Sequence, residues 1–265
     1  MEREPAGTAA AQGAIWGQRA RDWAEIQEPT ARPLYESVLE AFDVGEGTRV
    51  CDLGCGAGGF LHLASERGAL VSGLDATVEL LELARERNLL GDIRHGELEE
   101  LPFADETFDL VTGFNSFQFA ARPKNALQEA KRIVHEVGAV VMAVWGQPEQ
   151  CESAAVLKAV GALMPPPPPG APGLFALSPP GAVEALVAEA GLRSVRAVEV
   201  SCPMAYADLA SAKRGFGSAG PSAVARATSG EEALDAALTA ALSPFRQPAG
   251  GYRLDNVFRY VIATR

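Results

Sequence analysis

The sequence predicts an α/β protein in which helices cover both faces of a mostly parallel sheet. Between residues 49 and 145, apolar segments with the character of strands alternate with segments of helical periodicity, which is typical of parallel sheets. A glycine-rich loop, residues 54–59, joins the first of these strands to the first of these helices. Residues 256–263 then alternate apolar and polar side chains, so one more strand is expected at the end of the chain.

The N-terminal segment is expected to be helical after a frayed start. Residues 1–13 are rich in alanine and glycine, which is typical of a loosely held terminus. Residues 16–42 then follow a helical pattern, and Pro29 and Pro33 interrupt it.

The predicted core alternates strands and helices in chain order. We expect strands near residues 49–53, 70–74, 92–95, 108–113 and 138–145, and helices near residues 59–67, 77–87 and 123–134. In a further helix Ser178 is the expected cap, Pro179 begins it and Gly191 ends it. A strand near residues 193–200 follows.

Two segments fall outside this alternation. Residues 147–177 include the run Pro165–Pro169, for which an extended polyproline conformation is expected. Residues 201–253 resemble a helical insertion, with its strongest helical pattern at residues 231–242. Both segments can be surface additions, or they can form part of a lid over a ligand.

Composition and charge narrow the function classes. The chain has 265 residues, of which 48% are hydrophobic and 22% charged, as in ordinary globular proteins. Its net charge is -11, from 23 Lys and Arg against 34 Asp and Glu. That charge repels phosphate backbones and anionic bilayers, so nucleic acid and membrane surfaces are not expected partners.

The four cysteines and the N-terminus indicate a cytoplasmic protein. The cysteines form no Cys-x-x-Cys pair, and no paired histidines accompany them, so neither a metal site nor a disulfide framework is expected. The first residues lack the form of a signal peptide, and no apolar run is long enough to span a membrane. Nothing in the sequence indicates an oligomeric state.

Asp52 decides between two readings of the glycine-rich loop. Gly54, Gly56 and Gly59 satisfy the G-x-G-x-x-G fingerprint of NAD- and FAD-dependent oxidoreductases, but that match alone is weak. A carboxylate two residues before the first glycine would repel a pyrophosphate. It favours instead a ligand that carries positive charge and hydrogen-bond donors, as S-adenosylmethionine does.

The segment resembles the first motif of the class I S-adenosylmethionine-dependent methyltransferases, which reads Asp-x-Gly-x-Gly-x-Gly. The matching residues are Asp52, Gly54, Gly56 and Gly58, and the resemblance extends from about residue 45 to residue 146. It is nearest to the ubiquinone/menaquinone-type small-molecule methyltransferases. The resemblance implies a Rossmann-like, seven-stranded sheet whose last strand is antiparallel, and a methyl transfer that leaves S-adenosylhomocysteine.

Three later segments carry the other residues that the resemblance assigns to the cofactor. Asp75 ends the second strand and would take the ribose hydroxyls, although it can also stabilise the start of the next helix. Glu97 replaces the usual Asp of the family and would take adenine with the Leu98 amide. Phe114 and Asn115 would lie on the far side. The implied cofactor set is Asp52, Gly54, Cys55, Gly56, Gly58, Asp75, Ala76, Glu97, Leu98, Phe114 and Asn115.

We expect one methyltransferase domain over residues 1–265, with a core of about 45–147, 178–200 and 254–265. Residues 14–44, 148–177 and 201–253 would form a lid for the substrate, because ligands of such sheets lie beyond the carboxyl ends of the strands. Aromatic and charged residues of this lid, with Trp145 at a strand end, are the substrate candidates: Trp16, Trp23, Tyr35, Trp145, Tyr206 and Arg214. Surface or core roles are the alternative for each.

The chemistry itself requires little of the protein. Methyl transfer from a sulfonium is an in-line displacement that needs positioning, exclusion of water and, for some acceptors, a base. His62 is a weak candidate for that base and can equally be a surface histidine of its helix. The sequence leaves open whether the acceptor atom is O, N or C. A protein with this fold that binds the cofactor without methylating, or that senses it, remains an alternative, as does the oxidoreductase.

Overall fold

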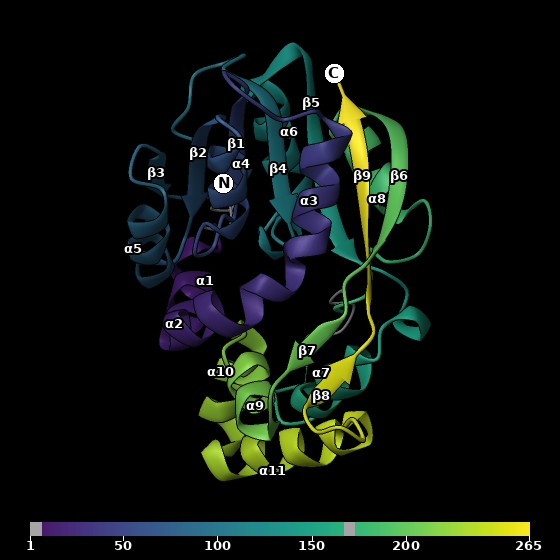
Figure 1. The fold of residues 1–265 in the computed structure, drawn as a ribbon. Coiled ribbons are helices and arrows are strands. Elements are labelled where there is room, and N and C mark those ends of the chain that lie inside the picture. Colours follow the sequence, from purple (N-terminus) through teal and green to yellow (C-terminus); the bar gives the residue numbers. More distant parts are fainter. Residues whose placement is uncertain (1–6, 167–172) are drawn as a thin grey trace, which may run out of the picture.

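A computed structural model of the chain describes residues 7–166 and 173–265, and a seven-stranded sheet forms its centre. The strands of this sheet are β1 (Arg49–Leu53), β2 (Leu70–Asp75), β3 (Asp92–His95), β4 (Phe108–Phe114), β5 (Val134–Trp145), β6 (Arg193–Ser201) and β9 (Val257–Thr264). Their order is β3-β2-β1-β4-β5-β9-β6 (Figure 1). Only β9 runs antiparallel to its neighbours β5 and β6, so the predicted sheet, including its antiparallel last strand, is confirmed.

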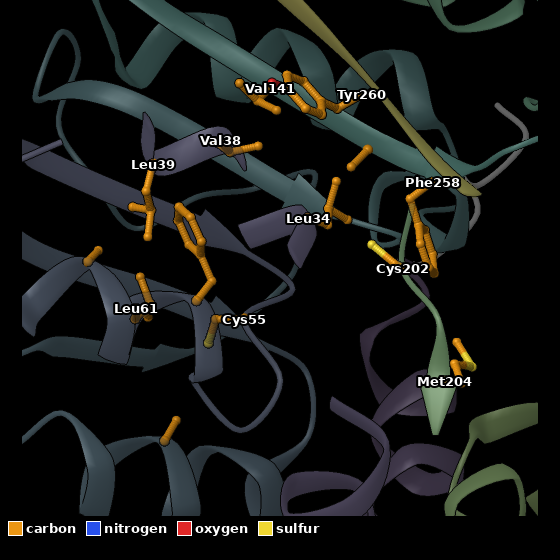
Figure 2. Packing of buried hydrophobic residues seen from close by; sticks show 14 of the residues in the cluster. Leu34, Val38, Leu39, Cys55, Leu61, Val141, Cys202, Met204, Phe258 and Tyr260 are labelled. Carbon is orange, nitrogen blue, oxygen red and sulfur yellow. The ribbon is translucent and has the colours of Figure 1, made fainter. Parts of the chain in front are cut away.

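Helices cover both faces of the sheet, as the alternating pattern predicts. They are α3 (Arg32–Ala41), α4 (Gly59–Glu66), α5 (Val78–Arg87), α6 (Pro123–Ile133) and α8 (Ala182–Glu189). Val50 of β1 packs with α3, α4 and α5, whereas its neighbour Cys51 packs with α6 and α8. Successive strand residues therefore enter opposite layers, which is the two-residue period of a strand. Figure 2 shows part of the layer on the Val50 side of the sheet, where Leu34, Val38 and Leu39 of α3 pack in one cluster with Val141 and Tyr260.

A second group of helices lies beyond the carboxyl ends of the parallel strands (Figure 1). It comprises α7 (Ser153–Gly161), α9 (Leu209–Gly217), α10 (Gly220–Ser229) and α11 (Glu231–Leu242), with a small hairpin of β7 (Met204–Tyr206) and β8 (Tyr252–Leu254). The helical insertion expected over residues 201–253 is therefore present, and α11 has the bounds expected for its strongest helix. Met204, Cys202 and Phe258 connect this group to the core cluster, as Figure 2 shows.

The N-terminal segment is helical from Ala9 onward, so the expectation of a frayed stretch through residue 13 was wrong. Its elements are α1 (Ala9–Trp16), η1 (Gly17–Arg19), α2 (Ala20–Asp22), η2 (Trp23–Gln27) and η3 (Glu28–Ala31). Two contacts hold its beginning: the Ala9 amide donates to Glu97 at 2.9 Å, and the Thr8 hydroxyl donates to the Phe119 carbonyl at 2.7 Å. Residues 1–6 lie outside the described residues.

Two other element boundaries differ from prediction. β5 begins at Val134, four residues before the predicted start of this strand at residue 138. Val134 pairs with Phe108, and the register then shifts so that Leu110 pairs with Ala139. α8 begins at Ala182, after Gly181, whose amide donates to the Glu184 side chain at 3.1 Å. Ser178 is therefore not its cap.

Short 3-10 turns complete the chain: η4 (Phe117–Phe119), η5 (Pro148–Gln150) and η6 (Ser243–Phe245). Of the proline run, residues 167–169 lie outside the described residues. Among the helices that the structure describes, none combines the length and apolarity needed to cross a membrane.

Candidate functional site

A cavity of about 210 Å³ lies where four parallel strands end. Gly54 follows β1, Asp75 ends β2, Phe114 ends β4 and Trp145 ends β5, and all four residues line the cavity. The opposite wall comes from the N-terminal segment and from the second group of helices. This is the position at which ligands bind to open parallel sheets.

The glycine-rich loop gives the cavity a wall of bare backbone. Gly54 and Gly56 have φ angles of +78° and +55°, in the left-handed region that favours glycine. A Cβ atom on Gly54 would lie 2.4 Å from the Cβ of Ser116, so a side chain would not fit there. Both glycines line the cavity. Cys55 and Gly58 lie in the same loop but outside the cavity wall, with Cys55 buried in the core.

Asp75 lies in the wall with both carboxylate oxygens already bonded to backbone. One oxygen accepts from the Gly56 amide at 2.9 Å and the other from the Thr77 amide at 2.8 Å. Burial raises the pKa of Asp75, while these amides oppose the rise. Each carboxylate oxygen keeps a second lone pair, so Asp75 orders the loop and can still accept from a ligand hydroxyl. Ala76, the next residue, also lines the cavity.

Asp52 lies behind the cavity wall rather than in it. Its carboxylate accepts a hydrogen bond from the Thr112 hydroxyl at 2.7 Å, between paired positions of β1 and β4. The residue is 3% exposed, and burial raises the pKa of Asp52 to about 7, which the neighbouring Glu28 and Asp75 reinforce. Asp52 therefore has no surface in the cavity wall, and only its charge, when it is ionised, can reach a ligand there.

Glu97 and Leu98 line the cavity but are bonded to each other. One Glu97 carboxylate oxygen accepts from the Leu98 amide at 2.8 Å, and the other accepts from the Ala9 amide of α1. The extra methylene of Glu, compared with the usual Asp, lets the side chain reach its neighbour's amide. Recognition of adenine by the Leu98 amide would require that amide to exchange its partner, whereas each Glu97 oxygen keeps a second lone pair for a ligand.

Phe114 and Asn115 occupy the end of β4 in the cavity wall. The ring of Phe114 packs on Tyr35 and Phe60, with ring centroids 4.8 Å and 4.7 Å away. Asn115 has a φ of +51°, a conformation that asparagine tolerates better than most residues. Its amide donates to the Ala143 carbonyl at 2.9 Å, which leaves the side chain at the cavity.

The structure separates the six substrate candidates into two groups. Trp16, Trp23, Tyr35 and Trp145 line the cavity. Tyr206 does not: its hydroxyl donates to the buried Gln27 side chain at 2.8 Å. Arg214 lies on the surface in an ion pair with Asp22 at 2.6 Å.

His62 also lies away from the cavity. It sits on α4, 3.6 Å from Glu66, with 46% of its side chain exposed. Its position fits the alternative of a surface histidine better than that of a base. Within residues 7–166 and 173–265, no cluster of three or more His, Cys, Asp or Glu side chains could hold a metal ion.

Glu28 is a site residue that the sequence did not reveal. It is 4% exposed, lines the cavity, and accepts from the Ala57 amide at 2.9 Å. Arg87 of α5 lies 2.5 Å from the other carboxylate oxygen. Burial raises the pKa of Glu28 to about 7 in spite of Arg87. No local motif marks Glu28, because its partners lie 29 and 59 positions away in the sequence.

Three buried polar atoms around the cavity lack a hydrogen-bond partner among the described residues. They are Trp23 Nε1, Ser116 Oγ and Gln118 Oε1, and all three residues line the cavity. Such atoms are costly unless a ligand or water pairs them. S-adenosylmethionine offers a carboxylate to donors such as Trp23, and amino and hydroxyl groups to acceptors such as Gln118 and Asp75. Its positive charge suits a wall with three acidic residues, so the site fits this cofactor.

The comparisons with known proteins agree with this fit. Residues 51–142, about a third of the chain, match the family model described as Methyltransferase domain. The malonyl-[acyl-carrier protein] O-methyltransferase of Erwinia pyrifoliae is 31% identical over 151 residues, 56% of each chain. The demethylmenaquinone methyltransferase of Paenarthrobacter aurescens is 31% identical over 111 residues, 42% of this chain and 44% of that protein. The chain thus spans about half the length of the curated relatives it matches.

Solved structures show the same fold. The [4+2]-cyclase SpnF superposes with a TM-score of 0.63 over 98% of both chains at 16% identity. Structures of S-adenosylmethionine-dependent methyltransferases share the fold as well. The resemblance to S-adenosylmethionine-dependent methyltransferases that the sequence predicts is therefore confirmed, and S-adenosylmethionine is the cofactor that this domain implies.

Proposed function

We propose that the chain is an S-adenosylmethionine-dependent methyltransferase that transfers a methyl group to an O, N or C atom of a small molecule. One observation carries the proposal: a single cavity joins the glycine loop and the acidic end of β2 to an apolar region at the ends of β5 and β9. The cofactor half and an acceptor half thus meet in one continuous cavity, as an in-line displacement requires.

In the cofactor half, each residue has a proposed role. The bare backbone of Gly54 and Gly56 admits the methionine end, and Asp52 supplies negative charge from behind the wall. Asp75 takes the ribose. Glu97 takes adenine together with the Leu98 amide, which exchanges its partner, and Phe114 and Asn115 lie on the far side of the adenine. When bound, S-adenosylmethionine supplies a methyl group on a cationic sulfur, a donor already activated for displacement.

In the acceptor half, the lid supplies binding and excludes water. By lid we mean residues 14–44, 148–177 and 201–253, which we propose belong with the core to one methyltransferase domain. Of the substrate candidates that line the cavity, we assign Tyr35 and Trp145 to this half. Trp16 and Trp23 pack on each other beside Phe119 and Gly56, so we place them near the cofactor instead. The described cavity wall contains no histidine, so we assign no general base.

The proposed setting is the cytoplasm, without nucleic-acid or membrane partners. All four cysteines are free and buried, which fits a reducing compartment. The net charge of -11 disfavours phosphate-rich surfaces.

The test is formation of S-adenosylhomocysteine together with a methylated product. The full chain is incubated with S-adenosylmethionine labelled in its methyl group and a panel of phenols, amines and quinones. We expect label in an organic product in equal amount to S-adenosylhomocysteine, and loss of both in Asp75→Ala. No transfer to any member, with cofactor binding intact, would count against methylation.

A second candidate is a non-methylating reaction in the same cavity. It is favoured by the fold shared with SpnF, a [4+2]-cyclase. That candidate predicts that an acceptor is converted while S-adenosylmethionine is not consumed.

A further inference from the structure

We propose that the methyl acceptor is an uncharged, largely apolar molecule that lies against Trp145 and Phe258, at the end of the cavity away from Asp75. The inference rests on the proposed function, because it identifies an acceptor half from the part of the cavity that the cofactor residues do not form. It goes further by naming the chemical class that this half admits.

The first support is the apolar surface at the ends of β5 and β9. Trp145 and Phe258 are paired residues of these two strands, and their ring centroids lie 4.4 Å apart. Phe175 approaches Trp145 from the lid, at 6.1 Å. The neighbouring wall is also hydrophobic and comes from Leu34, Leu157, Met204 and Phe216. A flat or aliphatic ligand would bury apolar surface here, worth about 25 cal/mol per Å².

The second support is the sign of the charge. Within the described residues, no Arg, Lys or His lines the cavity, whereas Glu28, Asp75 and Glu97 do. Asp52 adds a further acid behind the wall. The cation nearest to these acids, Arg87, is bonded to Glu28 and to the carbonyls of Ala57 and Ala24. An acceptor carboxylate or phosphate would therefore lose its water without gaining a cation from the protein, and the sulfonium of the cofactor would be its only opposite charge.

The third support is a tyrosine hydroxyl in the cavity wall. Tyr35 lines the cavity, and its hydroxyl has no hydrogen-bond partner among the described residues. Burial, with the charges of Glu28 and Asp52, holds the pKa of Tyr35 well above its usual range. The hydroxyl therefore keeps its proton and can donate to one neutral oxygen or nitrogen of an acceptor.

This class differs from the acceptor named in one relative. A malonyl group, as in the Erwinia pyrifoliae enzyme's name, carries a free carboxylate. The cavity described here offers no cation to that group. We therefore expect a different acceptor for this chain.

The experiment compares two probes that share a ring system and differ in charge. Binding of 2-naphthol and of 2-naphthoate to the full chain, saturated with S-adenosylhomocysteine at pH 7.5, is measured by calorimetry. We expect 2-naphthol to bind at least about tenfold more tightly. Equal or tighter binding of 2-naphthoate, or no binding of 2-naphthol, overturns the proposal. Binding of S-adenosylhomocysteine to the chain is measured first. If it does not bind, the result counts against the proposed function and not against the proposed acceptor class.

A substitution in the wall then tests the role of charge. Leu157 lies on α7, is half-buried and lines the cavity. In Leu157→Lys we expect 2-naphthoate to gain at least about tenfold in affinity relative to 2-naphthol. Leu157→Met, the matched control, should keep the original preference. An unchanged preference in Leu157→Lys, with the variant folded, contradicts the charge argument.

Discussion

The carboxylate of Glu28 accepts a hydrogen bond from the backbone amide of Ala57 at 2.9 Å, which binds the N-terminal segment directly to the glycine loop. Arg87 strengthens the link, since its guanidinium also donates to the carbonyls of Ala57 and Ala24, at 3.1 Å and 2.7 Å. The three residues connect the lid, the loop and α5. We predict that this link slows the release of a ligand from the cofactor half.

Removing the link should therefore speed cofactor release. In Glu28→Ala we expect the dissociation rate of S-adenosylmethionine to rise about tenfold or more, because one buried charge-assisted contact is worth about 1.5–3 kcal/mol. Stopped-flow tryptophan fluorescence, with Trp16 and Trp23 in the wall, measures the rate. The matched control is Glu25→Ala, in the same segment but in an exposed pair with Arg21. A rate equal to that of the control would show that Glu28 does not hold the lid.

Asp75→Ala should weaken cofactor binding about 10²-fold or more, since it removes the proposed contacts with the ribose and the bond that orders Gly56. Equilibrium titration with S-adenosylmethionine measures the dissociation constant. Asp92→Ala is the control, because Asp92 is a half-exposed acid at the start of β3 that pairs with Arg94. If the dissociation constant is unchanged in a folded Asp75→Ala protein, Asp75 is not part of the site.

Cofactor affinity should rise with pH between about 6 and 8. The pKa values of Asp52 and Glu28 are both raised to about 7, so each carboxyl carries a proton for part of the time near neutrality. A cationic ligand favours the ionised forms and releases protons on binding, so higher pH favours the complex. S-adenosylhomocysteine lacks the sulfonium charge and should show a smaller slope. Calorimetry of both ligands at several pH values checks this, and equal slopes would refute it.

Asp52→Asn should make the free energy of unfolding less dependent on pH. The folded pKa of Asp52 is about 7, above the usual value of 3.8, so the folded state holds a proton that the unfolded state loses. That stabilisation is complete below about pH 4 and is lost as pH rises through 7. Asparagine does not titrate and keeps an oxygen for Thr112. Urea unfolding at pH 5 and at pH 8 gives the drop in the free energy of unfolding over this range. We expect that drop to be smaller in Asp52→Asn than in the unmodified chain, by about 1 kcal/mol or more. An identical loss would mean that Asp52 titrates normally.

Tyr35→Phe should raise the KM for the acceptor about tenfold while the dissociation constant of S-adenosylmethionine stays the same. The change removes one hydroxyl donor and keeps the ring that packs on Phe60 and Phe114. Steady-state kinetics with an acceptor found in the panel gives the KM. Tyr252→Phe, in the hairpin, serves as control. Weaker cofactor binding in Tyr35→Phe would instead assign the hydroxyl to the cofactor half.

The sheet and the strand-end part of the cavity wall were predictable because local patterns in the sequence specify them. Apolar segments that alternate with segments of helical periodicity predicted the strands. The glycines after β1, which adopt left-handed conformations, predicted the loop. Asp75 followed from its place at the end of β2, since parallel strands bring their carboxyl ends to one edge. The strands, the glycine loop and the position of Asp75 are thus set by residues that are close together in the sequence.

The remaining features depend on contacts between distant segments. Glu28 meets Ala57 only because the N-terminal helices cross the strand ends, and no local pattern encodes that path. Asp52 lies behind the wall because the strand register places it beside Thr112, which takes its hydrogen bond. The capping of α1 by Glu97 likewise arises from a contact 88 positions away.

Calorimetric titration of the full chain with S-adenosylmethionine and, separately, with NAD tests the identity of the cofactor most directly. We predict saturable heat with S-adenosylmethionine and none with NAD, because the acids at the strand ends attract a cation and repel a pyrophosphate. Saturable binding of NAD without binding of S-adenosylmethionine would contradict the assignment of this cavity.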